Sequence, residues 1–472
     1  MLNVNAADEY FQGDVDVINA MIDNNNLSAV KNDPENWTFT EWSRNSPKRI
    51  TRIDLSKNPS SKGLAGDLDV SSLTELEYID ISPTKMIRVN NPLLEVEQNA
   101  ENQNIISRVL SFLDRQQTKQ DTGQNTEYLT VPAAKYLLKS LNASGCTALT
   151  ELNCSDNSLT DLNVSGCTAL IELNCGNNSL TNLNVSDCTA LTKLICRSNL
   201  MTELNASDCT ALTYLDCSYN DLTTLNANDC TALTYLDCSY NDLTTLNVSD
   251  HTELTNLNCN SNSMTNLNVS GCIELAYLKC SNNTLENLNV SSCSKLILLY
   301  CDDNQLRSLN VSGTALMNLN CDNNQLISLN VNDCTALNNL GCSGNLLTNL
   351  DVSDCTALNN LGCSGNLLTN LDVSDCTELN RLRCNDNLLM NLDISNCTKM
   401  ELLVCSNNQL KSLGTIPDSM QALDCSNNQL TSLGKLPDKL EALNCSNNQL
   451  TSLGTLPDKL TTLYCENNPL ID

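Results

Sequence analysis

The sequence predicts an α/β solenoid, in which short parallel strands stack into a sheet and the chain returns through extended or 3₁₀ segments. Three observations predict this fold class. A cysteine recurs every 20 or 21 residues from Cys154 to Cys465, an asparagine follows each of these cysteines three residues later, and aromatic residues make up only 3% of the chain. A fixed period of this length is the signature of stacked repeats. With so few aromatic residues, aliphatic side chains and cysteine must fill the interior.

One repeat, or rung, runs from Leu149 to Ala169 and reads LTELNCSDNSLTDLNVSGCTA. Leu152 and Cys154 alternate with polar residues, which predicts a strand with one face inward. Asn157 follows at the bend, where its amide can satisfy backbone groups that the turn leaves unpaired, and stacked rungs can link such amides to one another in a ladder. Leu159 covers the core from the convex side, where so short a rung leaves no room for a full helix. These positions match the leucine-rich-repeat template, whose parallel sheet lies on the concave face, with cysteine replacing a usual leucine.

The 27 cysteines form two series. Sixteen follow the predicted strands, from Cys154 to Cys465, and eleven follow the return segments, from Cys146 to Cys397, with His251 in a gap of the second series. Disulfides are the rival interpretation, but parallel strands in register hold neighbouring Cβ atoms about 4.8 Å apart, beyond the usual bridging range. We therefore expect buried, unreactive thiols with raised pKa values. Because no C-x-x-C motif occurs, we expect no metal site and no cofactor.

The charge balance excludes two classes of partner. The chain carries 26 Lys and Arg against 55 Asp and Glu, a net charge of −29, which repels phosphate backbones and anionic lipid. No apolar run approaches the roughly 18 residues that cross a bilayer. We expect a monomer with no nucleic-acid partner and no membrane insertion.

The sequence divides into an N-terminal cap over residues 1–130 and a solenoid of about 16 regular repeats over residues 131–472. Within the cap, Asp14 to Asp23 has the pattern of a short amphipathic helix. Residues 49–82 match the repeat template in two degenerate rungs, and residues 101–115 have helical spacing of apolar side chains. We expect this part to cover the first open edge of the sheet, which would otherwise promote aggregation.

Signals of catalysis are absent from the sequence. The single histidine, His251, occupies a core position, and neither G-x-x-x-x-G-K-[ST] nor G-x-G-x-x-G occurs. We expect no catalytic residues and no enzyme activity.

Tyrosine is concentrated in one part of the solenoid, at or next to positions that face outward from the strands. A tyrosine offers a rigid apolar ring with a hydroxyl group, which suits protein and sugar ligands. The predicted ligand-binding residues are Tyr214, Tyr219, Tyr235, Tyr240, Tyr277, Tyr300, Asp216, Asp237 and Lys279. The segment CTALTYLDCSYNDLTTLN occurs twice, so a duplication also explains part of the cluster, and ordinary surface tyrosines remain the alternative.

The cysteine-bearing rungs from Leu138 to Met400 resemble the cysteine-ladder repeats of bacterial internalins. The rungs from Ile416 to Leu453, with IPDSMQALDCSNNQLTSL, resemble those of secreted effectors of the YopM and IpaH type. The internalin resemblance implies an extracellular or cell-surface, non-enzymatic adhesin that recognises a host or neighbouring-cell protein or glycan through its concave face. The effector resemblance implies protein binding inside host cells. A structural spacer for a further C-terminal domain is the third possibility.

Overall fold

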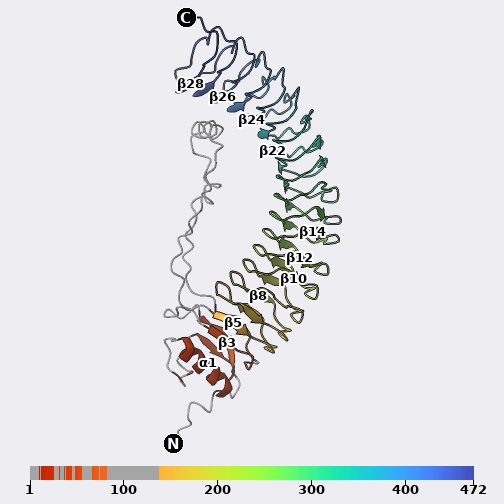
Figure 1. Cartoon of the computed structure of the whole chain (residues 1–472), viewed down its shortest axis with the longest axis vertical. Helices are drawn as coiled ribbons and strands as arrows, with labels where there is room; N and C mark the ends of the chain where they lie inside the picture. The colour runs from red at the N-terminus through yellow and green to blue at the C-terminus, as the bar shows by residue number, and fades with distance from the viewer. Residues whose placement is uncertain are drawn as a thin grey trace, which may run out of the picture. The chain divides into compact units, whose positions relative to one another are not determined.

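The computed structural model describes residues 12–25, 37–55 except 38 and 45–47, 66–81 except 74, and 138–471, together with Tyr10, Lys31 and Pro34. The described residues divide into two compact units, unit 1 up to Leu275 and unit 2 from Ala276 onward. In each unit the rungs stack along the chain, and each adds a strand to a main sheet (Figure 1). The predicted helix over residues 101–115 lies outside the described residues.

The main sheet of unit 1 is parallel apart from its first pair of strands. Its order is β1 (Thr40–Trp42), β2 (Ile50–Asp54), β4 (Tyr78–Asp80), β6 (Glu151–Asn153), β8 (Glu172–Asn174), β9 (Lys193–Ile195), β11 (Tyr214–Asp216), β13 (Tyr235–Asp237) and β15 (Asn256–Asn258). The register places buried residues of successive rungs opposite one another, as for Ile79 and Leu152. The two degenerate rungs, which contain β2 and β4, therefore begin the main sheet.

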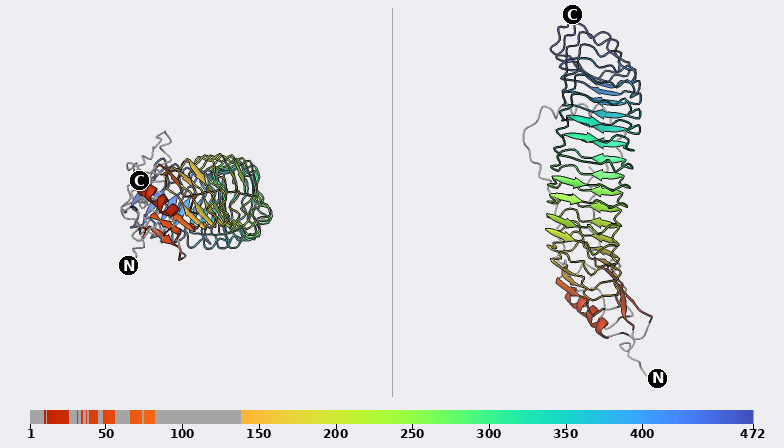
Figure 2. Two further views of the ribbon diagram at one scale, coloured as in Figure 1. Left: turned by 90° about the horizontal axis from the view of Figure 1, so that it is seen from below. Right: turned by 90° about the vertical axis from the view of Figure 1, so that its right-hand side faces the viewer.

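The return segments of unit 1 are extended, as the short repeat predicts. They form three small parallel sheets, namely β3 (Gly66–Asp69) with β5 (Leu138–Asn142) and β7 (Asp161–Asn163), β10 (Glu203–Asn205) with β12 (Thr224–Asn226), and β14 (Thr245–Asn247) with β16 (Asn266–Asn268). Leucines such as Leu159 and Leu162 are buried between these segments and the main sheet. The core is thus a column of aliphatic side chains and thiols between two layers of strands (Figure 2).

Unit 2 repeats the same architecture. Its main sheet contains β17 (Tyr277–Lys279), β18 (Leu298–Tyr300), β20 (Asn318–Asn320), β22 (Asn339–Gly341), β23 (Asn360–Gly362), β24 (Arg381–Arg383), β25 (Leu402–Val404), β26 (Ala422–Asp424), β27 (Ala442–Asn444) and β28 (Thr462–Tyr464), all parallel. The return segments contribute the pair β19 (Ser308–Asn310) and β21 (Ser328–Asn330).

The first edge of the main sheet is covered by β1, and the helix α1 (Gln12–Asn25), which contains the predicted helical segment, packs beside β3. β1 pairs antiparallel with β2 and so occupies the edge of that strand. Asp14 of α1 is fully buried and binds Arg49 through two hydrogen bonds of 3.0 Å, one from Nε and one from Nη2. It also accepts a bond of 2.8 Å from the backbone N–H of Ile50, which ties α1 to the start of β2.

All 27 cysteines are free, and all except Cys465 are buried. Burial raises the pKa of Cys175 to about 12 and that of Cys209 to about 11, because the interior does not solvate a thiolate. Many thiols of the second series donate to a carbonyl of the preceding rung, as Cys230 does to Ala206 at 3.1 Å. His251 keeps this contact, since its Nε2 lies 3.2 Å from the carbonyl oxygen of Ala227. Both series are therefore interior packing, as predicted.

Among the described residues, no helix has the length and apolar character needed to cross a bilayer.

Candidate functional site

The middle residue of most main-sheet strands is buried, while the first and third residues point to the other side of the sheet. We call the surface formed by these first and third residues the sheet face. Because neighbouring strands are in register, residues at equivalent positions lie side by side. The chemistry of the sheet face can therefore be followed rung by rung.

Tyr214 and Tyr235 form a stacked pair on the sheet face of unit 1. They are register partners on β11 and β13, and their ring centroids are 4.4 Å apart with an angle of 2° between the planes. Partial burial, followed by the nearby Asp216, raises the pKa of Tyr214. Partial burial and Asp237 raise the pKa of Tyr235 in the same way. Both hydroxyls are therefore protonated at neutral pH and can donate or accept hydrogen bonds.

Asp216 and Asp237 lie at the third positions of the same two strands. The Oδ1 atom of each accepts a hydrogen bond of 2.6 Å from a serine hydroxyl, of Ser218 and Ser239 respectively. Burial raises the pKa of Asp216, whose Oδ2 lies 3.8 Å from Nη1 of Arg197. These interactions hold both carboxylates in place, so they serve the local structure and border the tyrosine pair.

Tyr219 and Tyr240 form a second stacked pair in the turns that follow the same strands. Their centroids are 4.3 Å apart with an interplanar angle of 9°, and the two residues are 54% and 49% exposed. Both have a φ of 54°, the left-handed conformation that other rungs give to aspartate, asparagine, serine or glycine. Two bulky residues in this conformation carry backbone strain. The geometry of the turn therefore does not by itself explain why tyrosine occupies these exposed positions.

The remaining three predicted residues belong to unit 2. Tyr277 is 42% exposed at the first position of β17, and its register partner on β18 is Leu298. Lys279 pairs in register with Tyr300, and its Nζ lies 6.0 Å from the centroid of that ring. The predicted residues are thus divided between two stacked pairs with two aspartates in unit 1 and a Tyr–Lys–Tyr group in unit 2.

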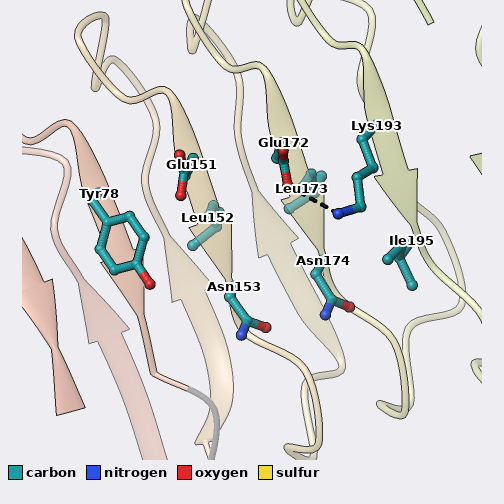
Figure 3. A pocket seen from close by; sticks show the side chains of 9 residues that line it. All are labelled: Tyr78, Glu151, Leu152, Asn153, Glu172, Leu173, Asn174, Lys193 and Ile195. Atoms are coloured by element: carbon teal, nitrogen blue, oxygen red, sulfur yellow. Dashed lines mark hydrogen bonds and ion pairs between the residues drawn. The ribbon is translucent and has the colours of Figure 1, made fainter. Parts of the chain in front are cut away.

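A pocket that sequence reasoning missed lies elsewhere on the sheet face of unit 1. It has a volume of about 230 Å³, and its lining includes Tyr78, Glu151, Glu172 and Lys193, from four successive strands (Figure 3). Nζ of Lys193 is 3.1 Å from Oε2 of Glu172. The signal was present in the repeat template, since all four residues occupy the first strand position. Only the pairing of β4 with β6 brings Tyr78 into this column.

Among the residues that the structure describes, no group of three or more His, Cys, Asp or Glu side chains could hold a metal ion.

Solved structures show what the chain is similar to. The functional domain of InlJ from Listeria monocytogenes, which includes a cysteine ladder, is 34% identical over 65% of this chain and 69% of that chain, with a TM-score of 0.57. YopM from Yersinia enterocolitica WA-314 is 27% identical over 71% of this chain and 79% of that chain, with a TM-score of 0.55. YopM from Yersinia pestis, a leucine-rich effector protein, is 27% identical over 64% of this chain and 85% of that chain, with a TM-score of 0.52. No protein-family model and no curated protein sequence matches the chain.

Proposed function

Because the chain belongs to the leucine-rich-repeat proteins of the cysteine-ladder internalin type, we propose that it captures a protein or glycan ligand on the sheet face of unit 1. Proteins of this family are non-enzymatic binding scaffolds. The stacked pair of Tyr214 and Tyr235 is the observation that carries the proposal. Tyr219 and Tyr240 add a second aromatic contact in the turns beside the same strands.

The tyrosine pairs have the properties of binding anchors. A tyrosine loses little side-chain entropy on binding and combines an apolar ring with a polar hydroxyl. Stacking at 4.4 Å fixes the orientation of both rings before a ligand arrives, which lowers the entropy lost on association. Asp216 is buried, and Asp237 accepts hydrogen bonds from Ser239 and Asn258, so both carboxylates support the strands from below the rings. The tyrosine rings and their hydroxyls therefore supply the contacts to a ligand.

The proposed location is the cell surface or the extracellular space, where the protein would act as an adhesin. The likeness to InlJ supports this location. The likeness to YopM, named an effector, favours a second candidate, in which the chain binds a protein inside a host cell. A spacer, the third candidate, would bind no ligand.

The test compares the wild-type chain with the double variant Tyr214→Ala/Tyr235→Ala on arrays of glycans and of host-cell proteins, both extracellular and cytosolic. We expect the double variant to lose about tenfold or more in affinity for the recognised ligand, as truncation of central aromatic anchors does. Tyr464→Ala is the matched control, because Tyr464 is an exposed strand tyrosine of unit 2. Equal binding by the double variant and the wild type would remove the proposed site, and the class of array that gives the ligand distinguishes adhesin from effector.

A further inference from the structure

The pocket at Tyr78 adjoins a cation–aromatic contact that the chain makes with itself. The guanidinium carbon of Arg52 lies 3.4 Å from the centroid of the Tyr78 ring. The same guanidinium lies 3.4 Å from Glu41 and 3.4 Å from Asp54. Arg52 is the register partner of Tyr78 on β2, so it occupies the β2 side of the ring. This side of Tyr78 thus holds a cation between an aromatic face and carboxylates.

On its β6 side, the Tyr78 ring again faces a position that holds a carboxylate, but Arg52 does not lie on this side. The pocket is lined by Tyr78 and by residues of β6, β8 and β9, and Arg52 is not part of its lining. Glu151 is the register partner of Tyr78 on this side. Within the described residues, no ion pair or side-chain hydrogen bond involves the carboxylate of Glu151. An aromatic ring and an unpaired carboxylate therefore border one cavity.

The charges around the pocket leave it negative. Glu151 and Glu172 are register partners, an arrangement that is unfavourable for two like charges. Lys193 balances only Glu172, to which it binds at 3.1 Å. Burial raises the pKa of Tyr78 most; Asp80, Asp54 and Glu151 raise it further, and Arg52 on the β2 side lowers it. A ligand cation would therefore complete the charge balance of this column of side chains.

We propose that the pocket formed by Tyr78, Glu151 and Glu172 binds an arginine side chain of a polypeptide ligand. The guanidinium lies on the β6 side of the Tyr78 ring and forms a charge-assisted hydrogen bond with Glu151. A planar guanidinium fits a ring and a carboxylate better than a compact, strongly hydrated ammonium does. This inference rests on the proposed function in one respect, namely that the captured ligand is a polypeptide.

The test uses a blocked peptide, acetyl-Ala-Arg-Ala-amide, and its neutral analogue with citrulline in place of arginine. Binding to the full chain is followed by NMR through the methyl groups of Leu152 and Leu173, which line the pocket. We expect saturable shifts of these methyl signals with the arginine peptide, with a dissociation constant on the order of 1 mM for a single contact. The citrulline peptide should give no saturable shift, since it lacks the charge.

Three variants separate the proposal from general attraction to an acidic protein. Glu151→Gln should weaken binding of the arginine peptide by about two- to fivefold, the effect of one exposed charge pair. Lys193→Met should strengthen it several-fold, because Glu172 is then available to the ligand. Glu203→Gln is the matched control, since Glu203 begins the same Glu-Leu-Asn strand sequence on the return side and is exposed. It should bind as the wild type does.

Equal binding of the two peptides, or an equal loss in the Glu151 and Glu203 variants, would overturn the proposal. This outcome is distinguishable from failure of the tyrosine site, because the peptide assay reads methyl groups of β6 and β8 and needs neither Tyr214 nor Tyr235. Should the recognised ligand of the arrays prove to be a glycan, the arginine peptide must still bind at Glu151 for the pocket assignment to stand.

Discussion

At the scale of single residues, the recurring asparagine connects each rung to the one before it. The amide nitrogen of Asn220 donates to the carbonyl of Cys217 in its own turn and to that of Cys196 in the preceding rung, at 3.1 and 3.2 Å. Its amide oxygen accepts from the N–H of Met201, also in the preceding rung. The sequence predicted that these amides bond to one another in a ladder, whereas Asn220 and its equivalents, such as Asn241, bond to the backbone of the preceding rung. Each one thereby satisfies buried backbone groups that the turn leaves unpaired.

Asn220→Ala should destabilise unit 1 by about 3 kcal/mol, because it leaves a buried N–H and several buried carbonyls without partners. Urea denaturation at equilibrium measures the change in the free energy of unfolding. Asn226→Ala is the control, since Asn226 is exposed and its amide makes surface hydrogen bonds, to the side chain of Asn205 and from the N–H of Asn228. A similar loss in the two variants would show that the ladder bonds contribute no more than a surface contact.

At the scale of elements, the strands and their register could be predicted from the sequence, whereas the pocket could not. Alternation around Leu152 and Cys154 fixes which residues face outward, and a constant repeat length places Tyr214 beside Tyr235. Tyr78 and Glu151 are 73 residues apart, and they become neighbours only because β4 pairs directly with β6. No local pattern reveals such a pairing, since the two strands are not separated by one repeat length.

The helix α1 is held at the start of the sheet by one carboxylate, which gives a prediction at this scale. Asp14→Ala should lower the free energy of unfolding by about 3–5 kcal/mol, because it removes both carboxylate hydrogen bonds of the partly buried guanidinium of Arg49 and the one to the N–H of Ile50. Hydrogen exchange of the amides of α1 and β2 measures the loss. Asp16→Ala, on the exposed side of the same helix, removes only a contact with Gln12 and should leave exchange unchanged. Rapid exchange in both variants would contradict the role of Asp14.

At the scale of the whole molecule, the buried thiols couple folding to pH. Burial holds their pKa values at about 11 to 12 in members such as Cys209 and Cys188, whereas thiols of an unfolded chain titrate near about 8.5. Because the native values are raised, the thiols contribute their full stability below about pH 8.5 and lose it as the pH rises toward the native values. Each buried thiol lowers the free energy of unfolding by about 1.4 kcal/mol per pH unit in this window.

Because the small losses of many buried thiols add, the reduced protein should be equally stable from about pH 6 to 7, should weaken from about pH 8 and should be unfolded by about pH 10. The cause is cumulative, since all 27 cysteines except Cys465 are buried. Circular dichroism reports the unfolding, and alkylation with iodoacetamide at each pH reports the number of exposed thiols. We expect at most Cys465 to react at pH 7 and all thiols to react above the transition. A urea midpoint that stays constant from pH 7 to 10 would contradict this linkage.

The register of neighbouring rungs has a consequence for how such a protein acquires recognition surfaces. Tyr214 and Tyr219 recur at the same positions of the next rung as Tyr235 and Tyr240, within two nearly identical segments. Since equivalent positions lie side by side, copying one rung in the gene converts a solitary outward-facing ring into a parallel pair without any new mutation. Unequal recombination between repeats can thus enlarge or erase a contact area in a single genetic event, while the packing inside every coil stays the same.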